Sequence, residues 1–178
     1  LVATFVTDIS NVGSNEPGTR EEILDRFGHI VPRARKLLEV PQNWRRWVLA
    51  DRDPISNWVD GNVVLLGDAA HPTHQYFAQG ACMAMEDSVM LAHQLEAHKG
   101  DFAKAFADYQ KARIVRAYRV VLSSREIGKH VYHAEGPARL IRNAVLGHKS
   151  QQSFRDSLAW LYGGTGLEEA DLAVVNQA

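Results

Sequence analysis

The chain contains 178 residues, of which 46% are hydrophobic and 23% are charged. This length suits one domain, or one domain with part of a second, and the composition excludes a largely disordered chain. Twenty Lys and Arg nearly balance 21 Asp and Glu, and a single cysteine, Cys82, excludes an internal disulfide. The longest apolar runs fall far short of the roughly 20 residues that span a bilayer, so we expect a cytoplasmic protein outside any membrane.

The chain begins with Leu1–Thr7, a β-branched stretch that is typical of a strand. A strand needs partners in a sheet, yet few strand-like segments follow, and there is no initiator Met. We therefore expect the chain to be the C-terminal part of a longer protein.

Short elements are predicted up to residue 66. Asn11–Gly18 is rich in turn residues, and Thr19 with Glu22 forms a capping box that starts a helix through Phe27. A second short helix is predicted to begin at Pro32 and to run through Leu38. Strands are predicted at Trp44–Leu49 and, after an Asp60–Gly61 turn, at Val63–Leu66.

Beyond Gly80 the apolar spacing predicts a mainly helical region. Asp101 is suited to cap the longest of these helices. The helices are expected over residues 80–95, 101–122, 137–146 and 153–161, followed by a turn at Gly163–Gly166.

Gly67-Asp68-Ala69-Ala70-His71-Pro72 follows a predicted strand and leads through a loop into a predicted helix at Gly80. Strand ends of this kind bind ligands in α/β folds, and the Asp68 carboxylate can accept hydrogen bonds from ligand hydroxyls. The alternative is a loop aspartate that binds nearby backbone amides.

The helix start at Gly80, Ala81 and Cys82 presents unpaired N–H groups and the positive end of the helix dipole, which favours anionic ligand atoms. Its small side chains would let a flat ring approach the backbone. The alternative, that Gly80 only relieves crowding between the helix and a sheet, is compatible with this. We expect Cys82 to be a buried spectator, because no base is identifiable near it.

The charged residues after Cys82 do not by themselves identify a binding site. Glu86 and Asp87 are either a solvated or capping pair or ligand-binding residues. Between Lys111 and Lys149 the chain is locally basic, and Arg113, Arg116 and Arg119 recur at the spacing of the solvated side of an amphipathic helix. We therefore do not expect nucleic-acid binding.

The string GDAAHPTHQYFAQGACMAMED resembles the second flavin-binding motif of the single-component FAD-dependent monooxygenases that hydroxylate aromatic rings. WRRWVLADRDPISNW, SSREIGKHVYHAEG and SLAWLYGG extend the resemblance over roughly residues 40–165. They resemble the branch that contains the 3-hydroxybenzoate 6-hydroxylases and, more distantly, the salicylate hydroxylases. The family's N-terminal GxGxxG turn does not occur in this chain, since Gly163–Gly166 lacks the required spacing and follows a helix.

The resemblance implies an α/β fold, α+β in this fragment, that forms the C-terminal part of a Rossmann-like FAD-binding monooxygenase. It implies the end of a substrate-binding sheet with short helices over residues 1–50, the second FAD-binding segment over 51–100, and a helical region over 101–178. A possible homodimer is compatible with it.

The resemblance also implies the chemistry. FAD would be bound through Gly67, Asp68, Gly80, Ala81 and Cys82, with NADH or NADPH as co-substrate and O2 as oxidant. The substrate would be a small aromatic acid, with 3-hydroxybenzoate giving gentisate preferred over salicylate. Gln75 is the expected catalytic side chain, and it would line the substrate pocket together with His74 and Tyr76. The alternative for Gln75 is an ordinary surface glutamine.

Two other hypotheses remain at this point. Asp68, His71 and His74 have side-chain types that bind zinc or iron, which would make the chain a metalloenzyme. Alternatively, the segment is an inactive helical packing or dimerisation module. We expect the fragment to be inactive without the rest of the flavoenzyme in any case.

Overall fold

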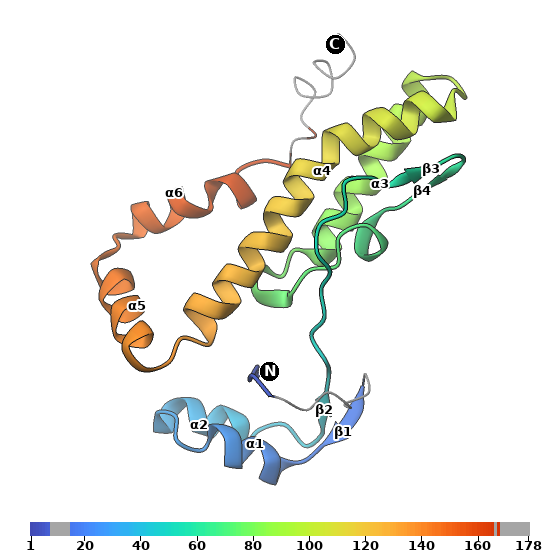
Figure 1. The fold of residues 1–178 in the computed structure, drawn as a ribbon. Coiled ribbons are helices and arrows are strands. Elements are labelled where there is room, and N and C mark those ends of the chain that lie inside the picture. Colours follow the sequence, from blue (N-terminus) through green and yellow to red (C-terminus); the bar gives the residue numbers. More distant parts are fainter. Residues whose placement is uncertain (8–14, 166, 168–178) are drawn as a thin grey trace. The chain divides into compact units, whose positions relative to one another are not determined.

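The computed structural model describes residues 1–7, 15–165 and 167 (Figure 1). The chain divides into two compact units, Leu1–Leu49 and Ala50–Ala178. Within the described ranges, no helix is long and apolar enough to cross a membrane.

The first unit contains a two-stranded antiparallel sheet, β1 (Glu16–Gly18) with β2 (Trp44–Arg46), and two helices, α1 (Arg20–Phe27) and α2 (Pro32–Leu38). The predicted capping box is confirmed, because the Glu22 N–H donates to Oγ1 of Thr19 at 3.1 Å. The proline start of α2 is confirmed as well. Local signals of this kind are reliable because each involves residues less than one turn apart.

Three strand and turn predictions in this unit need correction. Residues 1–7 form no strand, and the predicted strand at Trp44–Leu49 ends at Arg46. The turn-rich stretch at Asn11–Gly18 ends in β1, and residues 8–14 lie outside the described residues. A strand persists only where its N–H and C=O groups form a ladder, and among the described residues of this unit the ladder consists of the three residue pairs of β1 and β2.

The first strands of the second unit form a hairpin around the predicted Asp60–Gly61 turn. Strand β3 (Val59–Asp60) pairs antiparallel with β4 (Val63–Val64), and Gly61 adopts a φ of +55° in the turn. The strand predicted through Leu66 is shorter than expected. The Leu65 N–H still donates to the Trp58 carbonyl at 2.9 Å, in register with β3 and β4, but the Trp58 N–H donates to the Gln110 side chain and does not return the bond. Two short 3₁₀ turns follow, η1 (Gly67–Ala69) and η2 (Gln75–Phe77).

The predicted helices are all present. Helix α3 (Gly80–Ala97) and helix α4 (Phe102–Ile127) lie side by side as a helical hairpin (Figure 1), with Asp101 accepting the Lys104 N–H at the start of α4. Helices α5 (Gly136–His148) and α6 (Gln151–Tyr162) follow. Gly166 of the predicted glycine turn lies outside the described residues. The sequence did not indicate the π-helical turn η3 (Gly128–Tyr132) that continues α4.

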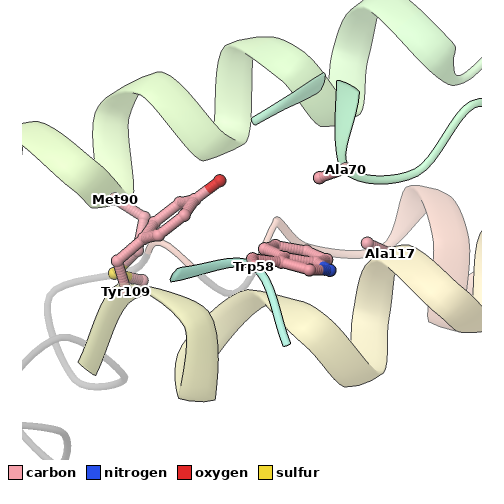
Figure 2. Packing of buried hydrophobic residues seen from close by; sticks show 5 residues of the cluster. All are labelled: Trp58, Ala70, Met90, Tyr109 and Ala117. Atoms are coloured by element: carbon pink, nitrogen blue, oxygen red, sulfur yellow. The ribbon is translucent and has the colours of Figure 1, made fainter. Parts of the chain in front are cut away.

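The core of the second unit lies between α3, α4 and the hairpin. The buried residues that pack together in this core are Trp58, Ala70, Met90, Tyr109 and Ala117 (Figure 2). Each large apolar side chain in it contributes roughly 2 to 3 kcal/mol by burial. Ala70 belongs to the glycine-aspartate motif, so the core fixes that motif against both helices. The mixture of small antiparallel sheets with a helical remainder agrees with the α+β character predicted for the fragment.

Candidate cofactor site

The structure brings Asp68 next to the start of α3. Asp68 lies in η1 with an exposed side chain, and its Oδ1 is 4.0 Å from the position that a Cβ on Gly80 would occupy. Thr73 borders the same position at 3.6 Å. A side chain at residue 80 would therefore compete with any ligand that contacts both the carboxylate and the helix start.

The first turn of α3 presents its backbone N–H groups without a side-chain cap from Gln79. Gly80, Ala81 and Cys82 begin this 18-residue helix, and all three have small side chains. The unpaired N–H groups carry roughly half a positive charge, which favours a negatively charged or electron-rich ligand atom by up to about 2 kcal/mol. Carboxylate and helix start together suit a ligand that carries both hydroxyl groups and an electron-rich polar ring.

Gly67 adopts a backbone conformation that an L side chain resists, with a φ of +55°. A Cβ at this position would also lie 3.1 Å from the Cβ of Ala84 in α3. The Gly67 N–H donates to Oδ2 of Asp87 at 2.9 Å. Glycine is therefore required here both for the turn and for close packing on α3.

The motif's backbone is also held from outside. The Arg52 guanidinium donates to the carbonyls of Ala69 and Ala70, at 2.5 and 3.1 Å. Arg52 precedes the hairpin in sequence, so the segment before β3 helps to fix η1.

Asp87 is fully buried and forms the centre of an ion-pair network between the motif and α4. It lies 2.5 Å from Nε2 of His71 and accepts from Nε of Arg113 at 2.8 Å. Burial alone would raise the pKa of Asp87, but hydrogen bonds from His71, Arg113 and Gly67 hold it below its ordinary value. Asp87 is therefore ionised at neutral pH.

Glu86 extends this network along the helical hairpin. It lies 2.7 Å from Nη1 of Arg113, and it accepts from Nε and Nη2 of Arg116, both at 2.8 Å. Arg116 also donates to the carbonyl of Trp160 in α6 at 3.1 Å. The acidic pair of α3 thus links the motif to α4 and α6.

This network corrects two sequence-based interpretations. Arg113 is not on a solvated face, because it is only 1% exposed. Glu86 and Asp87 are also buried, and they lie inside α3 and not at its end. The physical reason is charge pairing: a buried carboxylate persists when a guanidinium and backbone N–H groups satisfy it. The sequence signal was two acidic residues inside an otherwise apolar helix, followed by arginines at helical spacing.

The metal-site alternative is not supported by this geometry. His71 is paired with Asp87, His74 lies 3.7 Å from Oδ1 of Asp51, and Asp68 faces Gly80. Within the described residues, no group of three His, Cys, Asp or Glu side chains is arranged to hold a metal ion.

The predicted pocket residues lie together in and beside η2. The Gln75 side chain is exposed, while His74 and Tyr76 are partly buried. The Tyr76 hydroxyl is 2.8 Å from Nε2 of His133, and Ala78 ends the turn with a φ of +54°. The loop therefore leaves Gln75 directed away from the core and engages both of its neighbours.

The family model described as "FAD binding domain" matches residues 2–124. The 3-hydroxybenzoate 6-hydroxylase of Polaromonas naphthalenivorans (strain CJ2) is 52% identical over 163 residues, which are 92% of this chain and 40% of that protein. The 3-hydroxybenzoate 6-hydroxylase of Klebsiella oxytoca is 47% identical over 92% of this chain and 41% of that protein. The chain thus spans well under two thirds of the length of these relatives.

Solved structures share the fold. A salicylate hydroxylase in complex with its substrate matches with a TM-score of 0.73 and 28% identity, over 96% of this chain and 40% of that one. Klebsiella pneumoniae HpxO in complex with FAD and uric acid matches with a TM-score of 0.71 and 27% identity, over 78% of this chain and 36% of that one. With a family model that matches more than half of its residues, the chain belongs to the FAD binding domain family.

Proposed function

We propose that the Asp68 carboxylate and the start of α3 bind FAD. The observation that carries this proposal is their juxtaposition, with Oδ1 of Asp68 4.0 Å from the place where Gly80 lacks a side chain. Asp68 would accept hydrogen bonds from hydroxyl groups of the cofactor's ribityl or ribose chain. The N–H groups of Gly80, Ala81 and Cys82 would face the electron-rich polar edge of the flavin ring. The left-handed conformation of Gly67 would orient the Asp68 carboxylate toward the cofactor.

We also propose that the segment works within a longer flavoprotein that hydroxylates a small aromatic acid. Bound FAD would supply the redox chemistry, with NADH or NADPH as electron donor and O2 as oxidant. The names of the relatives favour 3-hydroxybenzoate as substrate and gentisate as product. A cytoplasmic location suits the dependence on a reduced nicotinamide cofactor.

In this proposal the chain's own residues bind and orient. Gln75 would hold the hydroxyl or carboxylate of the aromatic acid through its side-chain amide, which both donates and accepts hydrogen bonds. His74 and Tyr76 would border the same pocket. Correct orientation matters because a reaction between two bound groups accelerates mainly when the reacting atoms are held close together.

Salicylate is the second candidate substrate, because a salicylate hydroxylase shares the fold over 96% of this chain. The two candidates differ in the position of the hydroxyl group relative to the carboxylate. A pocket that holds both groups would accept one acid much better than the other.

The test uses the intact flavoprotein that contains this segment. Purified protein is expected to be yellow and to retain FAD on a desalting column. NAD(P)H consumption is expected to rise with 3-hydroxybenzoate, and much less with salicylate, with gentisate identified by chromatography. A colourless protein that does not bind added FAD would refute the cofactor site, while stimulation by salicylate alone would refute the substrate.

A further inference from the structure

The backbone on both sides of Gln75 is held by residues that come much later in the chain. The His74 carbonyl accepts a hydrogen bond from Oγ of Ser124 in α4 at 2.8 Å. The Phe77 carbonyl accepts one from the Tyr162 hydroxyl at the end of α6, at 3.0 Å. Gln75 itself is exposed. The later helices therefore fix the backbone of the loop through contacts that do not use the Gln75 side chain.

Tyr76 makes a side-chain contact between this loop and the segment that follows α4. Its hydroxyl is 2.8 Å from Nε2 of His133, which directly follows the π-helical turn η3. The two rings meet edge to face with centroids 5.7 Å apart. Burial lowers the pKa of His133 and raises the pKa of Tyr76, so both groups are neutral near pH 7, and the tautomer of His133 sets which of the two donates the hydrogen bond.

The π-helical turn is shaped to receive the Tyr76 ring. A Cβ on Gly128 would lie 2.3 Å from Cε2 of Tyr76, so only glycine leaves room for the ring. Tyr132, at the other end of the turn, packs against the same ring in a tilted arrangement, with a centroid distance of 4.9 Å. Isolated π-helical turns occur often at functional sites, and here the turn presents a seat for one side chain of the candidate pocket.

We propose that Tyr76, anchored by His133, is a positioning residue that fixes the orientation of Gln75 toward the aromatic substrate. This inference rests on the proposed function, because it takes Gln75 as the group that holds the substrate. It assigns a role to η3 and to His133, which lie more than 50 residues from the loop in sequence. Tyr76 acts through its neighbour, so its hydroxyl is not required to touch the substrate.

A double-mutant cycle in the intact flavoprotein tests this. Tyr76→Phe removes only the hydroxyl and keeps the ring over Gly128. We expect FAD affinity to be unchanged, kcat for 3-hydroxybenzoate to fall about 2- to 10-fold, and a larger share of consumed NAD(P)H to yield hydrogen peroxide instead of gentisate. In a Gln75→Leu background, Tyr76→Phe is expected to add little, because the group that it positions is gone.

Two controls separate positioning from general support of the fold. Tyr132→Phe removes the hydroxyl of an exposed residue in the same aromatic cluster. It should leave unchanged both kcat and the coupling, which is the share of consumed NAD(P)H that yields gentisate. His133→Gln retains an amide that can donate to or accept from the Tyr76 hydroxyl and should preserve much of the activity, whereas His133→Leu should behave like Tyr76→Phe.

The outcomes are distinguishable. Wild-type coupling in Tyr76→Phe beside an impaired Gln75→Leu would overturn this inference and leave the proposed function standing. If the losses of kcat in Tyr76→Phe and Gln75→Leu are equal and add fully in the double variant, this inference is also overturned, because Tyr76 would then act independently of Gln75. Loss of FAD binding in Tyr76→Phe would assign the residue to folding instead. A fully active Gln75→Leu variant would refute the role of Gln75, and this inference with it.

Discussion

The backbone N–H of Gly67 donates a hydrogen bond to Oδ2 of Asp87, 20 residues later, at 2.9 Å. Through this contact a fully buried carboxylate on α3 holds the left-handed turn that precedes Asp68. The opposite carboxylate oxygen accepts from Nε of Arg113 on α4. The proposed cofactor-binding turn is thus tied directly to the helical hairpin.

Gly67→Ala is expected to destabilise the protein and to weaken FAD binding. The change forces an L residue into a left-handed conformation, at a cost of about 1 to 2 kcal/mol, and adds a close contact with Ala84. Gly61→Ala is the matched control, since Gly61 has the same φ of +55° but nothing within 4 Å of a Cβ. Urea unfolding and FAD titration should show the larger loss of stability, and the only loss of affinity, in Gly67→Ala.

Asp87→Asn is expected to cost about 3 kcal/mol of stability, because it leaves the buried Arg113 with one carboxylate partner fewer. FAD affinity should fall as well, since the Gly67 turn loses a charged acceptor. Glu86→Gln is the comparison, because it weakens the same network without touching Gly67. If Asp87→Asn and Glu86→Gln are equally stable and bind FAD with equal affinity, Asp87 has no specific role in holding the Gly67 turn.

The acid dependence of stability should report on Asp87. Its pKa is held below the ordinary value in the folded state, so the carboxylate stabilises the fold above about pH 4 and loses this effect as the pH falls through its lower native pKa. The difference in unfolding free energy between wild type and Asp87→Asn should therefore shrink below pH 4. A difference that stays constant from pH 7 to pH 3 would show that the charge of Asp87 is unimportant.

Asp68→Asn is expected to weaken FAD binding about 10- to 100-fold with little change in stability. The side chain is exposed, so the fold does not depend on it, while loss of a charged acceptor for ligand hydroxyls costs roughly 1.5 to 3 kcal/mol. Asp60→Asn, at another exposed aspartate in the same unit, should change neither quantity. Isothermal titration of the cofactor-free protein with FAD measures the effect.

The sequence alone determined the features whose causes are local. Thr19 and Glu22 lie within one helical turn, as do Asp101 and Lys104, so the caps of α1 and α4 were predictable. The glycine-aspartate motif and the glycine at the start of α3 likewise marked the candidate site, because their spacing is part of the motif itself.

Only the tertiary structure decided which charges are buried and which strands exist. Arg113 is at a spacing that is typical of a solvated helix face, yet it is buried because Glu86 and Asp87, more than 25 residues earlier, face it across the hairpin. Leu1–Thr7 has strand-like residues, yet it forms no strand in the structure, where the described ladder of its unit joins β1 with β2. Tyr76 meets His133 across 57 positions. In each case the free energy depends on a partner distant in sequence, and no local pattern specifies that partner.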